Sequence, residues 1–494
     1  MKANKKIAIC ALAALLLTAM TGCDEEQTAN IGGSAPSAGM TSATTTAEDP
    51  DLDAPTDAKI KEIGTEAYTP DGNSGKITWL GYYDLKDDGS SAEQYKIFTS
   101  ELYGGEIEYV NCSSGTAYFE KMGMMIAADD SPDIVRYEWK SFPNGMSKNL
   151  YEALDDDIDL YSPLWSGMAD IAEDFAYNGK HYYYPYRVTT NYALNYNRAV
   201  LEEYALPDPY DLYMQNKWTW DTFKELLIDW CNADESHIGY AGEGAMSFIA
   251  TTGTTLIEVQ PDGTVKNNIN SVGVARAMEF CSSLYREGLT HHGELGDWIS
   301  PQTWAQNSRQ LLFLGMNPEW TYSAAAEVIQ NKQGAENDIC NTVSDFAFVP
   351  FPRDPSSETY SIAYDSFGYL VAKGAKNKKG AIDWINLNRV YETDENIIST
   401  KREEAIHPTP VYYTSGKYEG FQKWGLVWDE RQYDLWQDMM NPEKFNLLFD
   451  DCWGFSDDLN TVCTAVLFEP MFNGESFTQL SAEYAPVIDS LISE

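Results

Sequence analysis

Residues 178–198 read NGKHYYYPYRVTTNYALNYNR and contain three structural signals in succession. Asn178-Gly179 lies between aromatic segments and is typical of a two-residue β-hairpin turn, because Asn and Gly both tolerate a positive φ. The turn leads into an extended aromatic segment at residues 182–187. Residues 192–197 then predict a strand that runs directly into a helix beginning at Arg198. An extended segment is therefore expected to connect a hairpin to a strand–helix unit.

The region before this stretch alternates strands with helices. Residues 76–83 predict a buried strand, 93–103 a helix, 106–110 a second strand, 117–128 a second helix and 131–135 a third strand. Strands separated by helices are typical of a parallel sheet with helical crossovers. The chain is therefore expected to be an α/β protein.

The region after it contains further helices and strands. Thr219-Trp220-Asp221 opens a helix whose apolar residues recur with helical spacing: Phe223, Leu226, Leu227, Trp230 and Cys231. A second amphipathic helix ends at Gly288, a residue typical of helix C-termini. Further strands are predicted at 311–316, 346–352 and 367–372. A helix is predicted at 379–390, and the last hundred residues are expected to be mainly helical, ending with 477–492.

The first residues are typical of a secretory leader. Lys2, Lys5 and Lys6 precede an apolar segment at 7–17, which is too short to span a bilayer. The sequence LTAMTGC at 17–23 resembles the lipobox of bacterial lipoproteins, and the resemblance implies that Cys23 receives lipid and becomes the mature N-terminus. The alternative is a lone cysteine after an ordinary cleavable signal. Residues 1–22 are therefore predicted to be a lipoprotein signal peptide.

The next segment, residues 23–75, has no apolar periodicity and is rich in Ser, Thr, Ala, Gly, Pro and acids. Such a composition predicts a flexible, mostly unfolded tether. The remaining body has roughly 420 residues, which is more than one hydrophobic core usually includes. Two lobes are therefore expected from size alone.

The charge of the chain disfavours several classes of partner. Its formal net charge is −42, and it becomes about −45 when residues 1–22, with their three lysines and no acids, are removed. A strongly acidic surface repels nucleic acid and acidic membranes. Acidic runs such as 155–157 lack the glycine and the bidentate glutamate of a calcium loop, so they are interpreted as solvated surface.

Cysteine and histidine give no metal signature. Beyond Cys23, six cysteines remain in the mature chain, and no pair has CxxC spacing: Cys112, Cys231, Cys281, Cys340, Cys452 and Cys463. Their even number allows disulfides in an oxidising compartment, and buried free thiols are the equally open alternative. His291-His292 has no third ligand spaced nearby, so a solvent-facing loop is predicted there. No metal or cofactor is expected.

Five segments, in this order, resemble family 1 extracellular solute-binding proteins of ATP-driven importers, the class that includes maltose-binding protein. They are GKHYYYP at 179–185, LNYNR at 194–198, WTWDTF at 218–223, FVPFP at 348–352 and FGYLVAKGAKN at 367–377. Arg198 stands where the family more often has Lys, and the proline usual before the third segment is missing. The resemblance covers about residues 75–390 and is loose over the final hundred.

The resemblance implies a periplasmic-binding-protein-like fold with two α/β lobes, each discontinuous in sequence, that close on a ligand through a hinge. The expected divisions are 76–185 for the first part of lobe 1, 186–345 for lobe 2, 346–395 for the return to lobe 1, and 396–494 for a helical C-terminal segment packing on lobe 2 and the hinge. The implied protein is a monomer at the extracytoplasmic face of the cell membrane that delivers a solute to the permease subunits of an ABC transporter.

Carbohydrate is the commonest ligand class of this family, and sugars are bound by aromatic rings and by planar hydrogen-bonding groups. Ligands of open α/β sheets lie beyond the carboxyl ends of the strands. This rule selects the residues after the first and third strands: Tyr82, Tyr83, Asp84, Tyr137, Glu138 and Trp139. Tyr186 and Arg187 lie at the crossover, on the expected cleft floor, and Tyr364 and Asp365 precede the strand at Phe367 and would enter from the first lobe. By resemblance, Trp320 matches the family's aromatic residue that stacks on the sugar. For each, a packing aromatic or a surface acid is the alternative.

Two other functions remain open at this point. A secreted glycan-acting hydrolase needs two carboxylates across a sugar cleft, and the chain is rich in acids. However, the sequence contains no GxSxG, HExxH or phosphate-loop motif, so no catalytic residues are predicted. A binding protein for a peptide or another small nutrient on the same fold is the second alternative.

Overall fold

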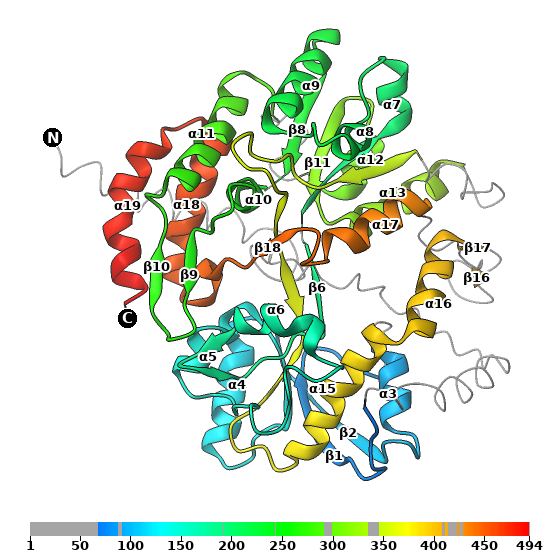
Figure 1. Ribbon diagram of the computed structural model, residues 1–494, viewed down its shortest axis with the longest axis vertical. Coiled ribbons are helices and arrows are strands. Elements are labelled where there is room, and N and C mark those ends of the chain that lie inside the picture. Colours follow the sequence, from blue (N-terminus) through cyan, green and yellow to red (C-terminus); the bar gives the residue numbers. More distant parts are fainter. Residues whose placement is uncertain are drawn as a thin grey trace. The chain divides into compact units, whose positions relative to one another are not determined.

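The computed structural model describes residues 68–86, 91–190, 192–242, 244–290, 299–333, 345–407, 411–412, 422–423 and 428–493 (Figure 1). The predicted signal peptide, Cys23, the tether up to residue 67, the histidine pair at 291–292 and Cys340 lie outside these residues. No helix in the described ranges is both long enough and apolar enough to cross a membrane.

The first sheet combines early strands with one late strand. Its strand order is β15-β3-β1-β2. The strands are β1 (Gly75–Gly81), β2 (Gly105–Asn111), β3 (Ile134–Arg136) and β15 (Tyr369–Val371). β1 pairs with β2 and β3 in parallel, as the alternation of strands and helices predicts, whereas β15 pairs with β3 antiparallel. This lobe is therefore discontinuous in sequence.

Helices from both parts of the chain cover the first sheet. The α-helices are α3 (Ala92–Phe98), α4 (Thr116–Ala127), α5 (Asn144–Ser147), α6 (Ala169–Glu173) and α15 (Lys378–Thr393). Two 3-10 helices lie among them, η1 (Trp139–Ser141) and η2 (Ser166–Met168). Trp79 of β1, Phe98 of α3 and Trp384 of α15 are fully buried in one hydrophobic core. α3 is shorter than the helix predicted at 93–103.

The second sheet has the order β12-β7-β11-β8. Its strands are β7 (Ala193–Asn197), β8 (Ile238–Gly242), β11 (Leu311–Met316) and β12 (Phe346–Val349). β11 is parallel to β8, and β7 runs antiparallel to both β11 and β12. Consecutive residues of β12 point into two different cores, with Ala347 in one and Phe348 in the other. Both faces of this sheet are therefore buried.

Capping chemistry explains where the helices of the second lobe begin. In α9 (Trp220–Ala233), Thr219 and Thr222 form a capping box. The predicted apolar residues of this helix are buried except Cys231, which is half-buried. Ser271 caps α11 (Val272–Arg286) by accepting from the Val274 N–H at 3.2 Å. The other helices are α7 (Arg198–Glu203), α8 (Pro209–Met214), α10 (Ala245–Ala250), α12 (Pro301–Gln306) and α13 (Pro318–Gln333).

The C-terminal region is mainly helical, as predicted. It contains α16 (Glu395–Ile406), α17 (Glu430–Met439), η3 (Asp451–Gly454), α18 (Asp457–Asn473) and α19 (Phe477–Leu491). α18 and α19 pack against α11 (Figure 1), and Cys463, Leu467 and Ile488 are buried in the same core as Val274. The short pair β16 (Val411–Tyr412) and β17 (Gln422–Lys423) is antiparallel.

Short strands connect the sheets. β6 (Arg187–Thr189) pairs antiparallel with β14 (Asp365–Phe367), and β13 (Ser361–Ala363) pairs parallel with β18 (Asn446–Leu448). A further antiparallel pair joins β9 (Ile257–Val259) to β10 (Val265–Asn267). The predicted strand at 367–372 is therefore two strands, because Phe367 pairs with Arg187 whereas Tyr369 pairs with Arg136 of the first sheet.

The predicted hairpin is present. β4 (Ala176–Tyr177) and β5 (Lys180–His181) pair antiparallel, with Tyr177 opposite Lys180, so the loop has two residues. Asn178 and Gly179 have φ values of 51° and 68°, as a primed turn requires.

The five described cysteines are free thiols: Cys112, Cys231, Cys281, Cys452 and Cys463. The described residues therefore favour the free-thiol alternative.

Candidate ligand-binding site

The carboxyl ends of β1 and β3 bring three polar side chains together. The Tyr82 hydroxyl donates to Glu138 Oε1 at 2.9 Å, and Arg136 Nη1 donates to the Tyr82 hydroxyl at 3.0 Å. Arg136 Nε lies 3.7 Å from the same Glu138 oxygen, with the two side chains 11% and 8% exposed. Because β1 and β3 are adjacent and parallel, residues that follow Leu80 and Val135 meet at one edge of the sheet.

Local structure holds Glu138 in this position. It is the N-cap of η1, where it forms a capping box with Ser141, and its own N–H donates to Ser141 Oγ at 3.1 Å. Burial raises the pKa of the Glu138 carboxyl, while Arg136 and the Tyr82 hydroxyl act in the opposite direction. Glu138 is thus a buried, oriented acceptor of the kind that binds hydroxyl groups.

A second group of side chains surrounds Phe367. The Arg187 guanidinium carbon lies 4.4 Å from the centre of the Phe367 ring, and that of Arg136 lies 5.8 Å from it. Arg187 and Phe367 are direct partners in the β6–β14 ladder. The neighbouring Tyr186 ring is stacked on Tyr369 at 5.9 Å. The predicted residues Tyr82, Tyr186 and Arg187 are therefore linked through Arg136 and the Phe367–Tyr369 segment.

Gly368 makes this packing fit. A Cβ at Gly368 would lie 2.4 Å from Cε2 of Tyr183, so only glycine allows the Tyr183 ring to approach the backbone between β14 and β15. The Gly368 carbonyl also accepts the Tyr137 N–H at 3.1 Å.

Three further predicted residues lie at the same ends of β1 and β3 and remain predictions. The half-buried Tyr83 ring packs edge-on against Tyr82, with ring centres 5.2 Å apart. Asp84 is half-buried and accepts the Lys86 N–H at 3.0 Å. Trp139 lies on η1, where Lys140 Nζ is 4.6 Å from its ring centre.

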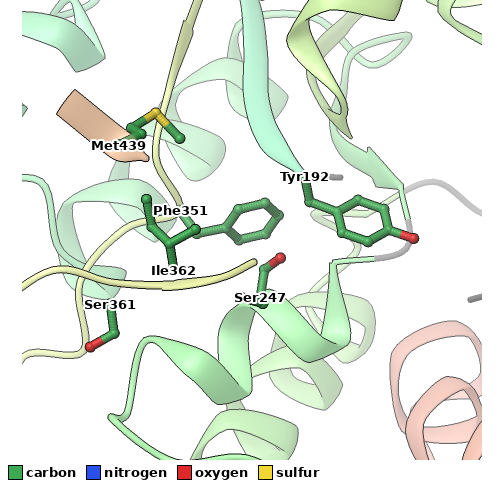
Figure 2. A pocket seen from close by; sticks show the side chains of 7 residues that line it. Tyr192, Ser247, Phe351, Ser361, Ile362 and Met439 are labelled. Atoms are coloured by element: carbon green, nitrogen blue, oxygen red, sulfur yellow. The ribbon is translucent and has the colours of Figure 1, made fainter. Parts of the chain in front are cut away.

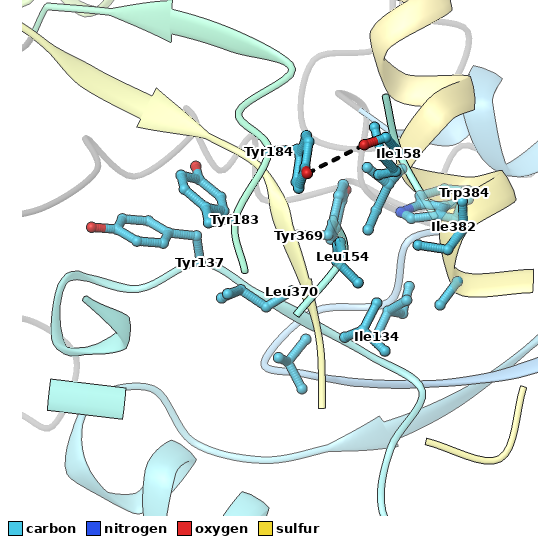
Figure 3. Close-up of a cluster of buried hydrophobic side chains, with 14 of the residues drawn as sticks. Ile134, Tyr137, Leu154, Ile158, Tyr183, Tyr184, Tyr369, Leu370, Ile382 and Trp384 are labelled. Carbon is cyan, nitrogen blue, oxygen red and sulfur yellow. Dashed lines mark hydrogen bonds between the residues drawn. The ribbon is translucent and has the colours of Figure 1, made fainter. Parts of the chain in front are cut away.

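Tyr137 (Figure 3) and Tyr364 both lie in the core that contains Trp79 and Trp384. The Tyr137 ring stacks on Tyr183 with centres 4.2 Å apart and is only 7% exposed. Tyr364 is 5% exposed, and its hydroxyl donates to Asp174 Oδ2 at 2.7 Å. Asp365 is half-buried in β14 and accepts the Ser366 N–H. These positions give both tyrosines a packing role, and their contact with ligand stays a prediction.

Trp320 lies in the first turn of α13, directly after β11. It is half-buried and packs against the core that contains Phe348, and its backbone N–H donates to Asn317 Oδ1 at 3.0 Å. A half-buried ring after a strand end fits the predicted stacking role better than a fully buried ring would.

A separate small pocket lies elsewhere in the chain (Figure 2). Its cavity volume is about 10 Å³, and its lining consists of Tyr192, Ser247, Phe351, Ser361, Ile362, Ala363 and Met439. A cavity of this size holds about one water molecule, so the pocket is too small for an oligosaccharide. None of the predicted site residues lines it.

Arg136 and Phe367 were not selected as site residues by sequence reasoning. Arg136 is the last residue of β3, and a charged residue at the end of a buried strand is the signal that could have identified it. Within the described ranges, no group of three or more His, Cys, Asp or Glu could hold a metal ion.

The sequence model of the bacterial extracellular solute-binding protein family matches residues 93–396, which is more than half of the chain. The chain belongs to this family. Members of the family are binding proteins, and the predicted periplasmic-binding-protein-like fold agrees with this assignment. In sequence, none of the curated proteins matches this solute-binding protein.

Solved structures of low sequence identity share the fold of this solute-binding protein. The sugar-binding protein MalE from Xanthomonas citri is 12% identical, with a TM-score of 0.60 over 85% of this chain and 97% of that one. An ABC substrate-binding protein of Listeria monocytogenes in complex with cycloalternan is 13% identical, with a TM-score of 0.55 over 85% and 99%. UgpB from Mycobacterium tuberculosis in complex with glycerophosphocholine is also 13% identical, with a TM-score of 0.55 over 85% and 98%.

Proposed function

We propose that this solute-binding protein captures a carbohydrate outside the cytoplasm and delivers it to the permease subunits of an ABC transporter. The family match over residues 93–396 is the observation that carries the capture of a solute. The buried Tyr82–Glu138–Arg136 network supports a sugar as that solute, because it presents planar acceptor and donor groups beside aromatic rings. The MalE and cycloalternan-bound structures, which share the fold, support the same ligand class.

In this proposal the ligand is bound between two lobes. Tyr82, Tyr83, Asp84, Tyr137, Trp139, Tyr364 and Asp365 would contribute from the first lobe, Tyr186 and Arg187 from the crossing strands, and Trp320 from the second lobe. The proposed divisions are those predicted from the sequence, with 76–185 and 346–395 in lobe 1 and 186–345 in lobe 2. Closure would then add contacts from Trp320 to those already made by the first lobe.

The protein is proposed to act as a monomer tethered through a lipid on Cys23, with residues 23–75 as a flexible connection. One acyl chain binds membranes only marginally, so durable anchoring would require two or more chains. A lipid anchor would keep the binding protein near its permease.

The proposal is tested with purified mature protein by calorimetric titration against a panel of neutral and acidic oligosaccharides, short peptides and glycerophosphodiesters. The same mixtures are analysed by chromatography for cleavage products. Saturable sugar binding without turnover is the expected result. Binding confined to peptides or phosphodiesters would overturn the carbohydrate assignment, and cleavage of a glycan would replace capture with hydrolysis.

A further inference from the structure

The Arg187 guanidinium differs from that of every other arginine in the chain. All ten arginines lie within the described residues, and the other nine each have an ion pair or donate to a carbonyl oxygen. Among those residues Arg187 has neither, and its Nε is buried without a hydrogen-bond partner. Its guanidinium carbon lies over the face of the Phe367 ring, 4.4 Å from the ring centre.

Leaving the buried Nε–H of a half-buried arginine without an acceptor is costly for the isolated fold. The guanidinium also carries its positive charge at any physiological pH, and a charge that is partly removed from water favours a direct partner. An aromatic face compensates only a small part of that cost. The arrangement therefore indicates that a partner outside the described chain completes the site.

Nearby carboxylates do not satisfy Arg187. Glu319 and Glu392 act on it electrostatically, but neither forms an ion pair with it among the described residues. Glu392 already pairs with Lys401 at 3.1 Å. The neighbouring Arg136 differs, because it is paired with Glu138 and bonded to Tyr82. Glu392 and Glu319 therefore favour the Arg187 charge only from a distance, and among the described residues no acceptor contacts its guanidinium directly.

The position of Arg187 is suited to contact with ligand. It opens β6, follows the Tyr186 ring and shares the Phe367 ring with Arg136. Arg187 is half-buried, and neither of its two terminal nitrogens forms a hydrogen bond with the described residues. Both nitrogens can therefore donate to a group that approaches from solvent.

We infer that the ligand is an anionic carbohydrate, whose carboxylate or phosphate group is bound by the Arg187 guanidinium. A planar guanidinium binds such groups through two parallel hydrogen bonds, whereas a neutral hydroxyl accepts a bond without neutralising the charge. The inference rests on the proposed function, and it specifies the charge class of the sugar.

The test compares matched ligands on the purified mature protein by calorimetry. Trigalacturonate is titrated against a neutral galactose trisaccharide, and glucose 6-phosphate against glucose, so that carboxylate and phosphate are distinguished. At least one anionic member should bind tighter than its neutral counterpart by roughly tenfold to a hundredfold, the range for a hydrogen bond to a charged group. Arg187→Gln should remove that preference while changing affinity for the neutral sugar less than about threefold.

Arg187→Lys keeps the positive charge but loses the planar group that donates two parallel hydrogen bonds. It should therefore cause an intermediate loss of affinity, confined to the anionic ligand. It also keeps the inference testable if Arg187→Gln does not fold.

Arg309→Gln is the matched control, because Arg309 forms an exposed pair with Glu203 before the start of β11. This variant should leave both affinities unchanged. Equal binding of neutral and anionic sugars, or an equal loss of both in Arg187→Gln, would overturn the inference while leaving the proposed function intact. Failure of every sugar to bind would overturn the proposed function as well.

Discussion

The side-chain amide of Asn317 donates to the Thr190 carbonyl at 3.0 Å and so joins the end of β11 to the segment that follows β6. The Oδ1 atom of the same residue accepts the Trp320 N–H at 3.0 Å. One asparagine side chain, itself 5% exposed, therefore fixes the first turn of α13 relative to the crossing segment. This relationship orients the Trp320 ring through backbone contacts.

Trp320→Ala should weaken ligand binding while leaving the fold largely intact. Loss of a stacking ring should cost about 1–3 kcal/mol of binding free energy, or roughly tenfold to a hundredfold in affinity. The half-buried ring should contribute less to the free energy of unfolding than a core residue does. Calorimetric titration and thermal unfolding of one preparation measure both quantities.

Trp304→Ala is the matched control for this prediction. Trp304 is fully buried in α12, and its Nε1 donates to the Leu311 carbonyl at 3.2 Å. Its loss should destabilise the fold by about 3–5 kcal/mol through the cavity it leaves. If Trp320→Ala shows the same loss of stability and its folded fraction keeps full affinity, Trp320 is a packing residue.

Glu138 should give the unliganded protein a distinct pH dependence of stability. Burial raises its pKa in the folded state, whereas the unfolded value is about 4.3. Between these two values the folded protein holds more protons than the unfolded chain, so the contribution of Glu138 to the free energy of unfolding falls as pH rises, by at most about 1.4 kcal/mol per pH unit. Below that window its proton is bound in both states.

The measurement subtracts the unfolding free energy of Glu138→Gln from that of the wild type at each pH. This difference in unfolding free energy should decline as pH rises from about 4.3 and level off above the folded-state pKa of Glu138. A constant offset is added to it, because Glu138→Gln also removes the carboxylate that pairs with Arg136. Tyr82→Phe removes a hydrogen bond to the carboxylate, so it should extend the decline to higher pH. A difference that rises with pH would show that the Arg136 charge dominates over burial.

Cys281, Cys452 and Cys463 should resist alkylation until the protein unfolds. All three side chains are buried, with at most 2% exposed, and the thiolate is the reactive form. Cys112 and Cys231 are half-buried, and burial raises the pKa of Cys231 to about 11, so they should react slowly. Iodoacetamide labelling with peptide mass spectrometry, with and without denaturant, measures this. A Cys452–Cys463 peptide that separates only after reduction would contradict the free-thiol state.

Ligand binding should compact the protein. Two lobes connected by the β6–β14 and β13–β18 pairs can rotate about those short segments, with the hinge predicted near residues 184–187 and 348–352. Small-angle scattering with and without a confirmed ligand measures the radius of gyration. An unchanged radius would argue for a rigid site.

Cys23→Ser should release the protein into the medium or leave its leader uncleaved. Without lipid, the leader is too short and the tether too polar to hold the chain in a membrane. Fractionation with mass determination of the N-terminus measures retention and processing. Normal processing together with unchanged membrane retention would refute lipidation at Cys23.

The sequence by itself determined the order of the elements and the α/β class. Asn178-Gly179 predicts the hairpin because the turn needs two positive φ values, and Thr219 marks the start of α9 because its side chain caps the helix. The end of the first strand indicates Tyr82 as a site residue, and the crossing segment indicates Tyr186 and Arg187. Each of these signals is local, so it can be recognised along the chain without knowledge of distant partners.

Only the tertiary structure decided the partners. Tyr364 and Tyr82 look alike in sequence, yet one donates to Asp174 in the core and the other to Glu138 at a strand end. The predicted strand at 367–372 divides at Gly368 because its two parts pair with strands far apart in the chain. Periodicity indicates that a side chain is buried. Hydrogen-bond partners and ladder register depend instead on distant segments, such as that of Asp174, which lies 190 positions from Tyr364, and local pattern does not encode them.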